Sequence, residues 1–233
     1  MARKAETKKT RGLLRDDAYE QILMAIILGE LEPGSRVDEK RLMKDFKLSQ
    51  ASVRDALYRL SLEGLVERHA RIGTRIGDLG LRELRDVFEA RMLVEGQAAR
   101  LAAQRATPED LAAIRKAYDG YEAVAETRDI RALVRMDRSF HRALAAACKN
   151  GQIEQAAIRL HNNAARFWCF NIQRTTSERH RAQIEEHLKV VDAIEKRDYA
   201  EIERVLTGVL GYYPDSRFFL ADPMSPDMPQ AAE

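Results

Sequence analysis

The sequence predicts a mainly α-helical protein with two domains, in which β-structure is limited to one short hairpin. The chain has 233 residues, which is long enough for two small domains that each bury a core. Residues 81–220 carry apolar side chains at helical spacing and contain no convincing strand, whereas residues 31–77 combine two short helices with a hairpin signal. We therefore expect a flexible basic arm (1–12), a first domain with a small β-hairpin (13–77), an all-α antiparallel helical bundle (81–220) and a flexible tail (221–233).

The first domain begins with an amphipathic helix over residues 13–29, which we expect to support the rest of this domain. A second, short helix follows, with Leu42, Met43 and Phe46 as its apolar stripe. The turn after it ends at Ser49, whose hydroxyl is suited to cap the next helix by accepting a backbone hydrogen bond.

The helix after this turn has one apolar face and one polar face. The apolar side chains recur at helical spacing and are expected to pack inward: Val53, Ala56, Leu57 and Leu60. The opposite face is expected to present polar side chains to a partner: Gln50, Ser52, Arg54 and Tyr58. Gly64 ends the helix, residues 65–68 form a strand, and residues 72–74 form a hairpin tip with Arg71 and Arg75 beside it.

Two helices joined by a turn and followed by a hairpin wing can hold a helix in the major groove of double-stranded DNA. Basic side chains on the helix and wing would contact phosphates, and polar ones would reach base edges. The candidate DNA-binding residues are Lys40, Ser49, Gln50, Ser52, Arg54, Arg71, Gly73 and Arg75. Residues 1–77 hold 16 basic and 12 acidic residues, a positive balance that suits nucleic acid, whereas the remainder holds 23 and 25.

This stretch resembles the winged helix-turn-helix of the GntR family of bacterial transcription regulators. The matching residues are Leu31, Pro33, Gly34, Leu42, Ser49, Val53, Arg54, Ala56, Leu57, Leu60, Glu63, Gly64, Leu65, Val66 and Gly73. One position departs from the family pattern, because Gln50 stands where the family usually has arginine. Glutamine pairs with an adenine edge but lacks the charge and the bidentate fit to guanine, so base preference is not transferred from relatives.

Six helices are expected in the second domain, near residues 81–105, 108–127, 129–148, 151–174, 177–197 and 199–213. This half resembles the FCD ligand-binding domain of the FadR-type branch of the same family. The resemblance is carried by Glu89, Arg91, Glu95, Ala98, Ala99, Asp137, Phe140, His141, Leu144, Asn150, Glu186, His187 and Asp198. It implies a homodimeric regulator that binds a palindromic operator and whose DNA affinity is controlled by a small organic acid.

Asp137 and His141 lie four residues apart on one apolar helix face, and His187 lies on another. Each histidine is either a core residue with one partner or, together with Asp137, a ligand of zinc, nickel or manganese. The resemblance implies a third histidine 22 residues after His187, but Val209 stands there and cannot ligate. His180, two turns before His187, is a further candidate. The site is thus either a three-ligand metal site or a pocket that binds its effector without metal.

Arg91 and Glu95 are four residues apart, so they either form an internal ion pair or leave Arg91 to bind an effector carboxylate. Asn163 and Arg166 are further candidate effector-binding residues.

We expect a transcriptional repressor, with a second domain that serves only for dimerisation as the alternative. An enzyme is not expected, because no separate nucleophile or glycine-rich phosphate loop accompanies the histidines. No apolar run approaches the roughly 20 residues that span a bilayer, and no signal peptide is visible, which predicts a cytoplasmic protein.

Overall fold

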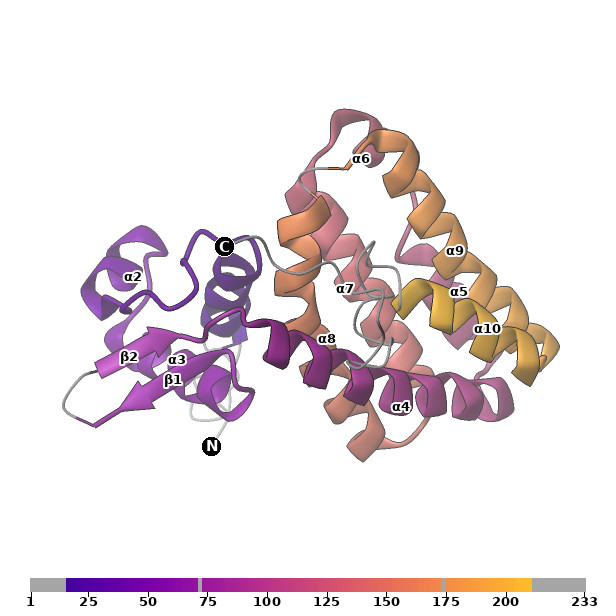
Figure 1. The fold of residues 1–233 in the computed structure, drawn as a ribbon, viewed down its shortest axis with the longest axis horizontal. Coiled ribbons are helices and arrows are strands. Elements are labelled where there is room, and N and C mark those ends of the chain that lie inside the picture. Colours follow the sequence, from indigo (N-terminus) through magenta and orange to yellow (C-terminus); the bar gives the residue numbers. More distant parts are fainter. Residues whose placement is uncertain (1–15, 71–72, 173–174, 211–233) are drawn as a thin grey trace, which may run out of the picture. The chain divides into compact units, whose positions relative to one another are not determined.

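The computed structural model describes residues 16–70, 73–172 and 175–210, so the predicted arm (1–12), the predicted tail (221–233) and Arg71 lie outside the described residues. The chain divides into two compact units at Gly80, and residues 165–170 group with the N-terminal unit (Figure 1).

The N-terminal unit contains three helices and a two-stranded antiparallel sheet among its described residues. Its elements are a helix described over 16–27, then α2 (Glu39–Asp45), α3 (Gln50–Leu62), β1 (Val66–His69) and β2 (Gly73–Ile76). The strands pair in the register Val66↔Ile76 to His69↔Gly73. This is the helix, turn, helix and wing that the sequence predicts.

Two side-chain caps fix the ends of the helices that flank the turn. Asp38 accepts hydrogen bonds from the backbone of Lys40 and Arg41 at the start of α2. Ser49 has an extended backbone and accepts from the Ser52 amide at the start of α3, which confirms it as the N-cap. Lys47, in the turn between the helices, takes the left-handed conformation.

The C-terminal unit is built from helices alone among its described residues. They are α4 (Leu81–Arg105), α5 (Pro108–Lys116), α6 (Tyr121–Thr127), α7 (Ile130–Ala147), α8 (Gly151–Ile172), α9 (Ser177–Lys196) and α10 (Tyr199–Leu210). The α7 helix packs against α4, α5 and α6, and α9 packs against α4, α5, α6 and α10. The helices nearest the predicted site are therefore held on several sides.

The prediction of a single helix over residues 108–127 is wrong. Gly120 adopts the left-handed conformation (φ 75°) between α5 and α6, which ends one helix and starts another. A glycine takes this conformation without steric cost, so the break falls at the residue that permits it. None of the described helices combines the length and the apolar character that crossing a membrane requires.

Candidate functional site

Three of the predicted DNA-binding residues lie around one groove on the N-terminal unit. Lys40, Gln50 and Arg54 are exposed. The groove has a volume of about 550 Å³ and is lined by Arg36, Val37, Asp38, Glu39, Lys40, Met43, Gln50 and Arg54. The α2 and α3 helices thus place cationic and amide side chains on one surface, where they can meet phosphates and base edges.

Arg54 is the cation at the centre of this surface. Its side chain is 63% exposed, and its Nε donates to Glu39 Oε2 at 3.0 Å. Ion pairs this exposed contribute about 0–1 kcal/mol, so exchanging Glu39 for a phosphate costs little.

Ser52 does not lie on the polar face, contrary to the prediction. It is buried, and its hydroxyl lies 2.9 Å from the Ser49 hydroxyl, so both serines are engaged in the turn. The physical reason is helical spacing. Ser52 precedes Ala56 by four residues and therefore shares the inward face.

The wing is tied to the loop that precedes α2. Arg75 is exposed and donates from Nε to the Gly34 carbonyl oxygen at 2.8 Å, while Gly73 begins β2 with φ 105°. Arg36 pairs with Arg75 in an isolated β-bridge and also lines the groove. Sequence reasoning missed Arg36, because it lies in a loop with neither periodicity nor a motif of its own.

In the C-terminal unit, four helices contribute residues to a buried polar cluster. The α7 helix contributes Asp137 and His141, α9 contributes His187, α8 contributes His161, and α4 contributes Arg91 and Glu95. Tyr118, in the turn between α5 and α6, donates its hydroxyl to Asp137 Oδ1 at 3.5 Å.

The three predicted metal ligands lie together. The Nε2 atoms of His141 and His187 are each 3.7 Å from Asp137 Oδ1. One ligand atom from each of the three residues lies within 4.8 Å of the other two. The rings of His141 and His187 are nearly perpendicular, at 88°, so their in-plane lone pairs can converge on one ion.

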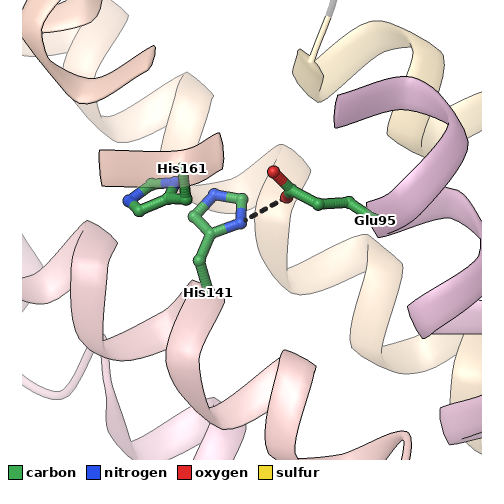
Figure 2. A group of neighbouring side chains, drawn as sticks. All are labelled: Glu95, His141 and His161. Atoms are coloured by element: carbon green, nitrogen blue, oxygen red, sulfur yellow. Dashed lines mark ion pairs between the residues drawn. The ribbon is translucent and has the colours of Figure 1, made fainter. Parts of the chain in front are cut away.

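A second set of three ligand atoms shares His141 and was not predicted. It consists of Glu95, His141 and His161 (Figure 2). Glu95 Oε2 lies 2.8 Å from His141 Nδ1. The rings of His141 and His161 are stacked, with centroids 4.1 Å apart and planes 24° apart. Lone pairs in two stacked planes run nearly side by side, so this set fits a single ion less well than Asp137, His141 and His187.

Burial and neighbouring charges shift the pKa values of the residues in the cluster. Burial, and then the charge of His141, lower the pKa of His161 and of His187 to about 4, against the opposing effect of Asp137. Burial alone would raise the pKa of Asp137, but hydrogen bonding to His161 and electrostatic attraction to the three histidine rings hold it below its usual range. Neutral imidazoles and an ionised carboxylate are the forms that ligate metals.

Two other positions named in the sequence analysis add no ligand to this cluster. Val209 is buried on α10 and offers no ligand atom. His180 Nε2 lies 3.1 Å from the Ile172 carbonyl oxygen and 2.6 Å from the Thr175 hydroxyl, so it is engaged near the start of α9.

Each of the predicted effector-binding residues has a hydrogen-bond partner of its own. Arg91 is buried and donates from Nε to Glu95 Oε1 at 2.5 Å, in agreement with the ion-pair alternative. Asn163 donates to the Arg159 carbonyl oxygen of its own helix. Arg166 groups with the N-terminal unit, where it donates to the Gly77 carbonyl oxygen.

Two family matches cover most of the chain. Residues 14–76 match the bacterial regulatory proteins of the gntR family, and residues 86–211, more than half of the chain, match the FCD domain. A probable D-xylose utilization operon transcriptional repressor of Paenarthrobacter nicotinovorans is 29% identical over 208 residues, which are 88% of this chain and 89% of the relative. The transcriptional repressor GlaR of Escherichia coli is 26% identical over 201 residues, 82% and 89% of the two chains.

Solved structures show the same fold. Escherichia coli McbR/YncC superposes with a TM-score of 0.74 at 20% identity and covers 84% of this chain and 93% of its own. A putative GntR regulator from Rhodococcus sp. RHA1 gives a TM-score of 0.65 at 21% identity, over 93% and 98% of the two chains. The family consists of transcriptional regulators rather than enzymes, as the sequence predicts. The chain belongs to the GntR family of bacterial regulatory proteins, and is a DNA-binding transcriptional regulator with a C-terminal FCD domain.

Proposed function

We propose that this regulator is a homodimeric repressor whose FCD domain holds a divalent cation at Asp137, His141 and His187. The observation that carries the proposal is the convergence of one carboxylate and two imidazoles within 4.8 Å in the interior of the unit. Mixed nitrogen and oxygen donors suit zinc, nickel or manganese. An ionised carboxylate that is buried without a counter-charge is costly, and a cation offsets that cost.

Three protein ligands leave a coordination position open, as in sites where a metal binds an exogenous ligand. The effector in this proposal is a small organic acid whose carboxylate takes that position. The predicted effector contacts of Arg91, Asn163 and Arg166 stay predictions. The proposal places the effector at the ion because the Arg91 guanidinium already donates to Glu95.

The DNA side of the proposal uses α3 and the wing. Arg36, Lys40, Gln50 and Arg54 line one groove, and the same groove on a second protomer would meet a second half-site of a palindromic operator. Two relatives are named as repressors, which supports repression as the outcome of binding. The effector would act by preferring one arrangement of the dimer over another.

The test of the metal site compares two histidines of the same helix. Zinc is added to the wild-type protein, to His187→Gln and to His180→Gln, and thermal unfolding is followed. Bound metal stabilises by mass action, so zinc should raise the melting temperature of the wild type and of His180→Gln but not of His187→Gln. Native mass spectrometry of the wild type should show a dimer that carries one metal ion per protomer. A wild-type melting temperature that zinc leaves unchanged would contradict the metal site.

A second candidate function is a DNA-binding regulator whose FCD domain serves only for dimerisation. Val209 favours it, because the resemblance implies a ligand at that position and valine supplies none. Operator binding that no organic acid alters, with or without zinc, would favour this candidate over the first.

A further inference from the structure

One arginine outside the proposed ligand set is linked to both of the carboxylates in the cluster. We propose that Arg91 is a positioning residue that decides which ring nitrogen of His141 and of His161 carries the hydrogen, and thereby turns the ligand atoms of Asp137 and His141 toward the ion. This inference rests on the proposed metal site. It assigns a role to three residues that lie outside the ligand set: Arg91, Glu95 and His161.

The first arm runs from Arg91 through Glu95 to His141. Arg91 Nε donates to Glu95 Oε1 at 2.5 Å, and Glu95 Oε2 lies 2.8 Å from His141 Nδ1. The carboxylate of Glu95 can only accept, so Nδ1 of His141 carries a hydrogen, and in the neutral ring Nε2 is then bare. That bare Nε2 is the atom 3.7 Å from Asp137 Oδ1.

The contact between Glu95 Oε2 and His141 Nδ1 has the distance of a hydrogen bond but not its alignment. Both atoms are fully buried, and neither has another hydrogen-bond partner among the described residues. Buried polar atoms need a partner, and each of these two supplies what the other lacks. Hydrogen bonds in ligand-free sites are often poorly aligned and tighten when the site is occupied.

The second arm runs from Arg91 through His161 to Asp137. Arg91 Nη2 lies 3.3 Å from His161 Nδ1, and a guanidinium only donates. His161 Nδ1 must therefore accept, which places the ring hydrogen on Nε2. That atom is buried, has no other hydrogen-bond partner among the described residues and lies 3.2 Å from Asp137 Oδ2. His161 is therefore placed to donate to this oxygen once the contact is aligned, which leaves Oδ1 facing His141 and His187.

The third ring is fixed without Arg91 and serves as an internal reference. His187 Nδ1 lies 2.7 Å from the carbonyl oxygen of Gln183, one turn earlier on α9. A carbonyl oxygen only accepts, so Nδ1 carries the hydrogen and Nε2 is bare. Removing Arg91 should therefore disturb His141 and His161 while His187 stays as it is.

The inference is tested first on the metal-free protein, where it does not depend on metal binding. Side-chain ¹⁵N spectra of the histidines distinguish the two tautomers. We expect hydrogen on Nδ1 in His141 and His187 and on Nε2 in His161. In Arg91→Met the tautomers of His161 and His141 should change, whereas that of His187 should not. A wild-type His161 with its hydrogen on Nδ1, or unchanged signals in Arg91→Met, would overturn the inference.

Zinc affinity, measured by competition with a chelator, is the second readout. Arg91→Met should weaken zinc binding by about 10–100-fold, as removal of outer partners of metal ligands does. Arg91→Lys should recover part of this loss, because one ammonium group can serve one arm. Arg138→Met is the matched control. Arg138 is also a buried arginine, and its Nε donates to Asn162 Oδ1, so its replacement removes a buried guanidinium but should leave the affinity unchanged.

If Arg91→Met does not fold, a second variant, His161→Phe, tests the second arm. His161→Phe retains a ring of similar shape against His141 and removes both nitrogens, so it breaks the second arm alone. It should weaken zinc binding and leave the His141 tautomer in place. Zinc affinity equal to that of the wild type in this variant would overturn the second arm. A wild-type protein that binds no zinc would contradict the proposed function, while the tautomers of the metal-free protein still decide the inference.

Discussion

The two units of this regulator each contain an arginine–glutamate ion pair, and the two pairs differ most in their burial. Arg54 and Glu39 pair at the groove that we propose contacts DNA, with side chains 63% and 34% exposed. Arg91 and Glu95 pair beside the proposed metal site with side chains 7% and 4% exposed. Water screens the first pair, so it can be exchanged for another partner at little cost. The second has no water to replace a lost partner, so it is fixed and can position its neighbours.

The same contrast appears in the charges of the carboxylates. Burial alone would raise the pKa of Glu95, but the charges of Arg91 and His141 and their hydrogen bonds hold it below its usual range. The glutamate therefore stays ionised, accepts a hydrogen bond from Arg91 on Oε1 and keeps Oε2 beside His141 Nδ1. An exposed ion pair is suited to an interface that forms and dissociates. A buried ion pair is suited to a site that has to keep its geometry.

The largest effect is expected from breaking the buried pair. Glu95→Ala leaves the buried guanidinium of Arg91 without its carboxylate, which should lower the free energy of unfolding by about 3–5 kcal/mol. Denaturant unfolding monitored by circular dichroism measures this loss. The matched exposed change, Glu39→Ala, should cost less than about 1 kcal/mol. Equal losses in the two variants would remove the distinction between the pairs.

The next largest effect is expected at the DNA surface. Arg54→Ala removes a cation from α3 and should weaken operator binding by about 1–3 kcal/mol if Arg54 contacts a base. Mobility shifts or fluorescence anisotropy with a selected operator measure this loss, and an unchanged melting temperature controls for folding. A variant that binds as tightly as the wild type would place Arg54 outside the interface.

Periodicity predicted most of the architecture because the helices of both units bury one face each. The turn before α3 was also predictable, because a serine in that position caps through its own side chain. The break at Gly120 was missed, since apolar spacing continues across it and a single glycine does not exclude a helix. Ser52 was misplaced because it was grouped with its polar neighbours rather than with Ala56, four residues later.

Helical spacing also explains why only part of the buried polar cluster could be predicted from the sequence. Asp137, His141 and His187 stand on strongly apolar stripes, where an ionisable residue is conspicuous. His161 shares its stripe with small residues, Ala157, Ala164 and Ala165, all of which are buried. A histidine at helical spacing from three alanines was therefore the available signal. The contact between Glu95 Oε2 and His141 on α7 joins two separate helices. No local sequence pattern encodes such a tertiary contact.

A smaller effect is expected on base preference, and it should be confined to one position of each operator half-site. Gln50 is exposed at the start of α3, where glutamine is suited to an adenine edge. Gln50→Arg should shift selection from a random DNA pool toward guanine at one position of each half-site, by about 1–3 kcal/mol of discrimination. Identical selected sequences for the two proteins would show that residue 50 reads no base.

The smallest effect is expected from loosening the exposed pair without removing its cation. Glu39→Gln keeps the size of the side chain but removes the charge that holds Arg54 at 3.0 Å. Arg54 then has no ion pair to exchange when it meets DNA, and the groove loses one of its negative charges. Operator affinity should therefore rise by up to about 1 kcal/mol, and the gain should shrink as salt is added.

Asp45→Asn provides the control for a charge change that leaves Arg54 alone. Asp45 is also exposed and also paired with an arginine, Arg41 at 3.2 Å, but it lies outside the groove. Both substitutions raise the net charge by one unit, so long-range attraction to DNA increases equally in each. A gain confined to Glu39→Gln identifies the release of Arg54 as its cause. Equal gains in the two variants would trace the effect to net charge, and the exposed pair would then have no part in setting DNA affinity.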